Sequence, residues 1–344
     1  MNKSNWLITG GCGFIGTNLI KHLVHDGGHG IRILDNLSVG TCDDLSRVCD
    51  FEKHDFKDLS SALGHPIADS VELLVGDIRD SGICRQAFHG IEIIVHLAAN
   101  TGVDPSVKNP RLDMETNVIG TLNMLDAARQ NGVRRFIFAS SGASIGECTP
   151  PIHEELSMHP VSPYGASKSA GEAYCSAYFR TFGIETVSLR FGNVYGPRSG
   201  RKTSIVAKFI RQALLGKTCK IYGDGAQTRD FIFIDDLVRA ICLSAFKEGV
   251  GGEIFQIATS KERTVNEVAN AIISILKSSG NIDMRIEHGE DRVGDVRRNF
   301  SDTTKALKYL GWQAKTDFNV GIRNTIEWFI DESDLSHTDK YLKK

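Results

Sequence analysis

Residues 6–16 read WLITGGCGFIG, and this stretch decides the fold class of the chain. WLIT (6–9) is a short apolar run typical of a buried strand, and the residues after the glycines are spaced like a helix. Gly10, Gly13 and Gly16 permit a tight turn, a close approach of backbone to a diphosphate, and packing of the helix on the strand. The stretch therefore predicts the strand, turn and helix of a dinucleotide-binding fold.

The residues around this turn also indicate which dinucleotide it would bind. The diphosphate would be held by the first N–H groups of the helix, including those of Phe14 and Ile15. Asp35 ends the next predicted strand, 25 residues after Gly10, and Asn36 follows it. A carboxylate there can accept hydrogen bonds from ribose hydroxyls and would repel a 2′-phosphate, which favours NAD over NADP. The alternative is that Asp35 only caps a turn.

Short apolar runs alternate with amphipathic stretches through the first half of the chain. The expected strands are 6–9, 31–34, 71–75, 91–98, 135–140 and 186–190, and the expected helices include 15–25 and 115–130. This alternation predicts an α/β fold with a doubly wound parallel (Rossmann-type) sheet and helices on both faces. The stretch 38–70 is longer than a usual crossover, so we expect an irregular insertion with one or two short helices.

The pattern changes after about residue 191, where Gly, Pro and Arg cluster in FGNVYGPRSGRK (191–202). A helix is expected at 204–216 and another beginning near Asp235. The predicted parts are an NAD-binding Rossmann domain (1–191), a smaller mixed α/β lobe (192–330) that binds substrate, with 232–262 returning to the first domain, and a polar tail (331–344).

The bulk composition excludes several classes of protein. The 344 residues are 41% hydrophobic and 24% charged, as in ordinary globular proteins, and 40 basic against 42 acidic residues give a net charge of −2. That balance argues against a nucleic-acid or membrane-surface partner. No run approaches eighteen apolar residues and no leader segment precedes the first strand, which predicts a cytoplasmic protein. Eight scattered cysteines lack metal-site spacing. The trio His22, His25 and His29 is the strongest candidate for a metal site, but it is interpreted as a solvated helix end that runs into the turn Asp26-Gly27-Gly28, so no metal is expected.

PYGASK (163–168) places a tyrosine and a lysine four residues apart. On a helix, Tyr164 and Lys168 would share one face. The spacing alone allows two interpretations, the first turn of a surface helix or a phenol held beside an ammonium to move a proton.

Eight motifs occur along the chain in a familiar order. They are GGCGFIG (10–16), DI (77–78), HLAA (96–99), SS (140–141), PYGASK (163–168), NVYGP (193–197), GDGAQTRDF (223–231) and RVGD (292–295). In these motifs the chain resembles the extended short-chain dehydrogenase/reductase superfamily, in its NAD-dependent nucleotide-sugar epimerase/dehydratase branch. It is most similar to UDP-glucose and UDP-N-acetylglucosamine 4-epimerases.

The resemblance implies roles for the catalytic and cofactor-binding residues. Tyr164 would carry the proton, Ser141 would orient the substrate hydroxyl, and Lys168 would lower the tyrosine pKa and hold the nicotinamide ribose. The cofactor would be NAD. Its further contacts are expected from Asp77, Ile78, Leu97, Ala98, Ala99 and Asn117.

The resemblance also implies a nucleoside-diphosphate sugar as substrate, most often with UDP. Arg229 and Arg292 would grip the diphosphate, because the planar guanidinium suits phosphate oxygens. Asn193 would donate to the same group, and Asp295 would hold the nucleoside ribose. The start of the 204–216 helix, at Ile205, and Asn299, four residues after Asp295, would complete the substrate pocket, with Asn299 bordering the sugar.

The residues after Ser141 favour one reaction within this branch. Its 4,6-dehydratases place an Asp-Glu pair there, whereas this chain has Gly142-Ala143, which cannot carry a proton. Its decarboxylases have an acidic residue within the Tyr–Lys stretch, which here is GAS (165–167). Oxidation at C4 followed by return of the hydride to the other face, a 4-epimerisation, is the simplest chemistry left.

Other readings stay open at this point. They are a UDP-glucuronate 4-epimerase, a 4-reductase, a 2-epimerase, or a non-catalytic NAD-binding scaffold. Two departures from the family pattern bear on the sugar: Ile145 replaces a usual tyrosine, and Thr101-Gly102-Val103 lacks a lysine found in some epimerases.

Related enzymes usually dimerise, so a homodimer is expected through helices at 112–130 and 163–182.

Overall fold

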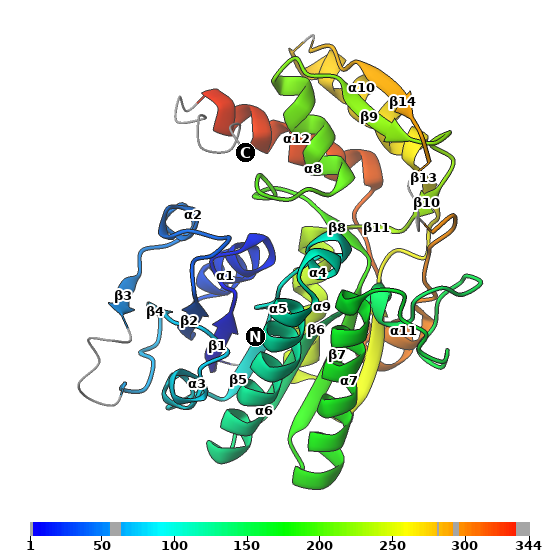
Figure 1. The fold of residues 1–344 in the computed structure, drawn as a ribbon. Helices are drawn as coiled ribbons and strands as arrows, with labels where there is room; N and C mark the ends of the chain where they lie inside the picture. The colour runs from blue at the N-terminus through cyan, green and yellow to red at the C-terminus, as the bar shows by residue number, and fades with distance from the viewer. Residues whose placement is uncertain (1–2, 56–62, 281, 292–295, 335–344) are drawn as a thin grey trace.

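The computed structural model describes residues 3–55, 63–280, 282–291 and 296–334, and an eight-stranded sheet forms its centre (Figure 1). The strands pair in parallel. In spatial order they are β12 (Glu253–Ile257), β7 (Glu185–Phe191), β6 (Arg135–Ser141), β5 (Ile93–His96), β1 (Asn5–Thr9), β2 (Gly30–Asp35), β4 (Val71–Val75) and β3 (Glu52–Asp55). The six predicted strands are all present, and the predicted fold class is confirmed.

The sheet is wound in two directions from β1. The chain moves through β2 and β4 on one side and through β5, β6 and β7 on the other. The order therefore reverses between β1 and β5, and the loops that leave their carboxyl ends diverge there. Such a switch point is where open α/β sheets bind ligands.

Alternating side chains of β1 bury the sheet on both faces. Trp6 and Ile8 join the core cluster that contains the apolar side of helices α1 and α9. Leu7 joins the cluster formed with α3, α6 and α7. This period of two is what a strand covered on both faces requires. The helices are α1 (Phe14–Asp26), α9 (Ile234–Phe246), α3 (Ser81–Ala87), α6 (Gly120–Gln130) and α7 (Pro163–Phe182).

Two segments differ from the sequence-based expectation. The insertion 38–70 contains the expected short helix, α2 (Cys42–Ser46), but also the edge strand β3. That strand reads EKHD and offers no apolar alternation, so its pairing with β4 was not predicted. The expected helix 115–130 begins with a π-helix, Glu115–Ile119, before α6. It is preceded by α4 (Val103–Lys108) and α5 (Pro110–Met114).

Most elements after β7 gather beyond the carboxyl edge of the sheet (Figure 1). They are β8 (Asn193–Tyr195), α8 (Ile205–Leu214), β9 (Cys219–Tyr222), β10 (Thr228–Arg229), β11 (Phe231–Phe233), β13 (Arg263–Thr264), α10 (Val265–Gly280), β14 (Ile286–Gly289) and α12 (Phe318–Asp334). Helix α11 (Thr304–Leu310) instead packs against β12 and α9. Helix α8 packs against α10 and α12, whereas β12 and α9 belong to the central sheet and its cover. Within the described segments, no helix has both the length and the apolarity to span a bilayer.

Candidate active site

The glycine turn between β1 and α1 is packed too tightly for side chains. A Cβ on Gly10, whose φ is +68°, would lie 2.9 Å from the backbone nitrogen of Ala98. A Cβ on Gly16 would lie 2.5 Å from the Cα of Gly11. Gly13 is the N-cap of α1 and has no side chain with which to cap it. The first N–H groups of α1 and the positive end of its dipole therefore suit a diphosphate.

Asp35 lies beside this turn at the end of β2. Its Oδ2 accepts a hydrogen bond from Cys12 N at 3.0 Å, and its Oδ1 accepts one from Leu37 N at 2.8 Å. Burial raises the pKa of Asp35, and these two N–H groups oppose the rise. The carboxylate thus caps the turn, which was the alternative role that the sequence allowed for Asp35. Since a carboxylate can accept about four hydrogen bonds, it retains capacity for ribose hydroxyls, and the pocket fits NAD.

The adenine side of the predicted pocket is braced by an ion pair. Asp77 accepts two hydrogen bonds from the Arg79 side chain, at 3.0 and 2.8 Å, one from Arg79 N at 2.9 Å and one from Asn36 Nδ2 at 3.1 Å. The pairing with Arg79 lowers the pKa of Asp77 to about 2. The Ile78 side chain is buried and would meet a Cβ placed on Gly120, so it packs in the core.

The loop after β5 lies against the glycine turn. Leu97, Ala98 and the neighbouring Ala99 are half-buried, and Ala98 N donates to the Thr9 hydroxyl at 3.1 Å. Asn117, from the π-helix, holds the continuation of this loop. Its Oδ1 accepts a hydrogen bond from Asn100 N at 2.8 Å, and its Nδ2 donates one to the carbonyl of Asn100 at 3.0 Å.

Helix α7 begins with a strong local signal that fixes Tyr164 in its first turn. Ser162 caps the helix by accepting a hydrogen bond from Gly165 N at 3.1 Å, and Pro163 occupies the first helical position. Tyr164, Lys168 and the later residue Glu172 follow at intervals of four, so they form one stripe along the helix. The expected helix and shared face are therefore present.

The environment of Tyr164 differs from the expectation. Burial raises the pKa of Tyr164 to about 12, a hydrogen bond with the Ser141 side chain lowers it, and the charge of Asp113 raises it further. The sequence had predicted a lowered pKa through Lys168. Burial cannot be read from the spacing of two residues, and here it outweighs the favourable contacts. At neutral pH the phenol is protonated and hydrogen-bonded to Ser141.

Lys168 is enclosed directly beneath the phenol. It is 4% exposed, its Nζ donates to the carbonyl of Ala139 at 2.8 Å, and this Nζ lies 5.8 Å from the centre of the Tyr164 ring. Burial lowers the pKa of Lys168 to about 8, against the charges of Asp113 and Glu172, which raise it. The ammonium is thus poised to lose its proton just above neutral pH.

Sequence reasoning missed the buried ion pair below this lysine. Arg190 of β7 binds Glu172 through two hydrogen bonds, Nε to Oε1 at 2.8 Å and Nη2 to Oε2 at 2.7 Å. Ser140 and Ser144 also donate to Glu172 Oε1. Both charged side chains are almost fully buried, so the pair ties α7 to β6 and β7. The position of Glu172 four residues after Lys168 was the available signal.

Part of the predicted substrate pocket can be placed. Arg229 Nη1 donates to the carbonyl of Val296 at 2.7 Å, beside the return of the chain after RVGD. Asn193 N donates to the carbonyl of Asp230 at 2.8 Å. Asn299 is half-buried next to β10, the strand of Arg229, and its N–H donates to Thr228 Oγ1 at 3.4 Å. Ile205 is the first residue of α8, and Arg292 and Asp295 lie outside the described residues.

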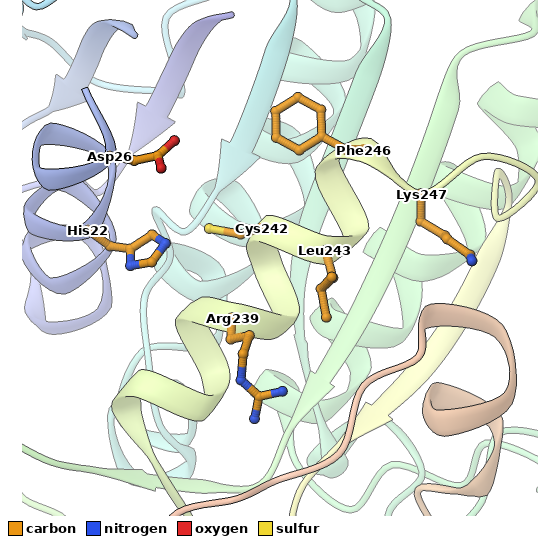
Figure 2. Close-up of a pocket in the computed structure, with 7 residues that line it drawn as sticks. All are labelled: His22, Asp26, Arg239, Cys242, Leu243, Phe246 and Lys247. Carbon is orange, nitrogen blue, oxygen red and sulfur yellow. The ribbon is translucent and has the colours of Figure 1, made fainter. Parts of the chain in front are cut away.

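A cavity of about 560 Å³ lies apart from this chemistry, between α1 and α9 (Figure 2). His22 and Asp26 line it from the last turns of α1, roughly 12–18 Å along the helix from the glycine turn at 1.5 Å per residue. None of the predicted site residues lines it. Its other lining residues are Arg239, Cys242, Leu243, Phe246 and Lys247.

One member of the histidine trio near this cavity, His29, is engaged in buried hydrogen bonds. His29 is buried, and its Nδ1 accepts hydrogen bonds from Ser4 N at 3.4 Å and from Trp6 Nε1 at 3.3 Å. Its Nε2 lies 3.1 Å from Asp26 Oδ2. In the part of the chain that the structure describes, no group of three or more His, Cys, Asp or Glu side chains could hold a metal ion.

Comparison with known proteins shows the family to which this chain belongs. The sequence model of the NAD dependent epimerase/dehydratase family matches residues 6–258. A UDP-glucose 4-epimerase from Mycolicibacterium smegmatis is 35% identical over 331 residues, which is 95% of this chain and 99% of that protein.

Two solved structures share the fold over nearly their whole length. The UDP-glucose 4-epimerase of Thermotoga maritima, solved with UDP-glucose, has a TM-score of 0.83 and 33% identity and covers 96% of this chain and 99% of its own. A UDP-N-acetylglucosamine 4-epimerase from Methanobrevibacter ruminantium, in complex with UDP-N-acetylmuramic acid, has a TM-score of 0.84 and 29% identity. The match covers 96% of this chain and 100% of that one. The chain belongs to the NAD-dependent epimerase/dehydratase family, as its motifs predicted.

Proposed function

We propose that the protein inverts C4 of a UDP-sugar through a transient 4-keto sugar, with NAD retained through turnover. The observation that carries the proposal is the composition of the site. The phenol of Tyr164, the hydroxyl of Ser141 and the buried ammonium of Lys168 lie together. The two residues after Ser141 are Gly142 and Ala143, whose side chains cannot act as a second acid or base. Such a site can remove and return hydrogen at one carbon, but it offers nothing to expel water.

The chain's own residues move the proton. Ser141 accepts a hydrogen bond from Ala143 N at 3.2 Å and is hydrogen-bonded with the Tyr164 phenol, so it would orient a substrate hydroxyl beside that phenol. As a phenolate, Tyr164 would take the proton of the C4 hydroxyl and later return it to the oxygen of the ketone, which regenerates the phenolate. NAD would be held by the glycine turn and Asp35 and would supply the acceptor for the C4 hydride and its return to the other face, and its positively charged oxidised ring would favour the phenolate. Lys168 keeps an ammonium near the same oxygen.

The first test is the cofactor content of the purified protein. Because the proposed reaction is redox-neutral, we expect acid treatment to release about one NAD per chain and activity to need no added nucleotide. A dinucleotide-free preparation that consumes one reduced cofactor per product would contradict the proposal and support a 4-reductase. A preparation that holds NAD but converts none of the UDP-sugars would support the scaffold alternative.

For the sugar, we propose UDP-N-acetylglucosamine and UDP-N-acetylgalactosamine, with UDP-glucose and UDP-galactose as further substrates. Asn299 carries this assignment. It is half-buried beside the strand of Arg229, which is the position expected to border the sugar. Asn is small enough to leave room for an acetamido group and can hydrogen-bond its amide. A UDP-glucuronate 4-epimerase remains the alternative, and a comparison of the three sugar types as substrates distinguishes them.

Asn299→Tyr tests this gate. A tyrosine ring in the space of the acetamido group overpacks a formed pocket at a cost of about 1–3 kcal/mol. We expect kcat/KM for UDP-N-acetylglucosamine to fall by about ten- to a hundredfold, at ~1.4 kcal/mol per decade, while UDP-glucose is largely spared. Steady-state kinetics with both substrates measures the difference.

The control is Asn299→Ala, which adds no bulk. It should keep the N-acetylated substrate within about tenfold of wild type, the effect of one lost hydrogen bond. If Asn299→Tyr depresses both substrates equally, or neither, Asn299 does not border the acetamido group and the sugar assignment fails.

We also propose a homodimer through α5–α6 and α7. Several apolar side chains remain exposed on these helices, by more than a third of their surface: Leu112 and Met114 of α5, Ile119 of the π-helix, and Tyr174 and Phe182 of α7. Such a patch is typical of a protein interface. A monomer in sedimentation velocity at micromolar concentration would contradict the proposal.

A further inference from the structure

A buried carboxylate that no motif singled out lies against the catalytic helix. Asp113 belongs to α5, which packs on α7, and it is 1% exposed. Its Oδ1 accepts a hydrogen bond from Asn117 Nδ2 at 3.1 Å. The same Nδ2 lies 3.0 Å from the hydroxyl of Ser167, the residue directly before Lys168. Asp113 therefore reaches the catalytic pair through side chains that belong to the site.

The carboxyl of Asp113 is subject to opposing influences. Its Oδ2 is buried, and no hydrogen bond to this oxygen is found among the described residues. Burial raises the pKa of Asp113, whereas a hydrogen bond with the Ser167 side chain and the charge of Lys168 lower it. The ammonium of Lys168 therefore stabilises the carboxylate form against burial.

Building on the proposed epimerase function, we propose that Asp113 is a positioning residue for the reaction. It is the buried counter-charge that keeps Lys168 protonated beside Tyr164. Lys168 needs such a partner because it is enclosed, with its Nζ hydrogen-bonded to a neutral carbonyl. Without a neighbouring negative charge, a buried ammonium loses its proton readily.

Other titratable groups also face Lys168. On α7 itself they are Tyr164, Glu172 and Cys175. At the end of the central strand β5 lies His96, whose pKa is lowered first by burial and then by the charge of Lys168. Glu172 is already paired with Arg190, which offsets its charge. The Cys175 thiol and the buried His96 are neutral, because burial raises the pKa of Cys175 to about 12 and lowers that of His96 to about 3. Asp113 is the carboxylate in this set that has no cation of its own.

Asp113→Asn isolates the charge, because its side-chain oxygen can still accept the Asn117 bond. The protein is labelled with ¹³C at lysine Cε, and the Lys168 signal is assigned by its loss in Lys168→Arg. We expect Lys168 to titrate near pH 8 in the wild-type protein and at a pH lower by about half a unit or more in Asp113→Asn. Asp113→Glu, which restores the charge, should move the titration back toward wild type.

The matched control is Glu115→Gln, which removes a carboxylate two residues away. Glu115 is 39% exposed and pairs with Arg111 on the surface, so its charge is screened. The Lys168 titration should be unchanged in this variant. Equal titrations in wild type and Asp113→Asn, or equal shifts in Asp113→Asn and Glu115→Gln, would overturn the proposal.

The pH dependence of kcat supplies a second readout. Removal of one negative charge lowers the pKa of both Lys168 and Tyr164, since Asp113 raises both. The whole profile should therefore move to lower pH in Asp113→Asn, whereas loss of a merely structural contact lowers kcat without moving the profile. The lysine titration needs no turnover, so it tests Asp113 even if the epimerase assignment itself fails.

Discussion

Tyr164→Phe is expected to lower kcat by about 10²–10⁴-fold while the protein stays folded and keeps its bound NAD. The phenylalanine ring fills the same space in the first turn of α7, so packing is conserved. Only the hydroxyl is lost, and with it the group that we propose exchanges a proton with the substrate oxygen. Turnover of each UDP-sugar and the thermal midpoint, measured on the same preparation, check the two halves of this statement.

Tyr309→Phe is the matched control, because Tyr309 lies on α11, outside the proposed interface, with 45% of its surface exposed. It should retain turnover within about twofold, as expected of a surface change. A Tyr164→Phe variant that turns over at a rate close to wild type would remove Tyr164 from the chemistry and leave PYGASK as an ordinary helix start.

Glu172→Gln is expected to lower the free energy of unfolding by about 3–5 kcal/mol. The change is nearly isosteric, but it leaves the guanidinium of Arg190 buried without its counter-charge. Arg190 Nη1 already has no hydrogen-bond partner among the described residues, so the arginine has little left to compensate the loss. Chemical denaturation followed by circular dichroism measures the difference.

The double variant Glu172→Leu with Arg190→Met separates charge from packing. Replacing both members of a buried pair with apolar residues is often neutral or stabilising, so this variant should recover most of the lost stability. A single Glu172→Gln change that costs less than about 1 kcal/mol would show that the pair does not hold α7 to the sheet.

The parts of the structure that depend on local sequence were predictable. Strand β1 and the glycine turn follow from an apolar run and from two positions, Gly10 and Gly16, that leave no room for a Cβ. The start of α7 follows from its serine cap and Pro163. Strand β3 was not predictable, because its residues are polar and its only reason to be extended is the neighbouring strand β4.

The site was predictable in its residue types but not in its electrostatics. The motifs named Ser141, Tyr164 and Lys168, and the structure brings them together. The direction of the Tyr164 pKa depends on burial and on Asp113, which lies 51 residues away in sequence and carries no motif. Contacts of this kind are set by how α5 packs on α7, and a single sequence does not contain that packing in any local pattern.

The most direct test of the account follows the hydrogen at C4. Each of the three UDP-sugar types, deuterated at C4, is incubated with the purified protein in ordinary water without added nucleotide, and the product is analysed by mass spectrometry and NMR. The account predicts the C4 epimer with its deuterium fully retained, because the hydride leaves and returns within one site. A product lighter by one water, an epimer whose C4 hydrogen comes from solvent, or no epimer from any of the sugars would contradict it.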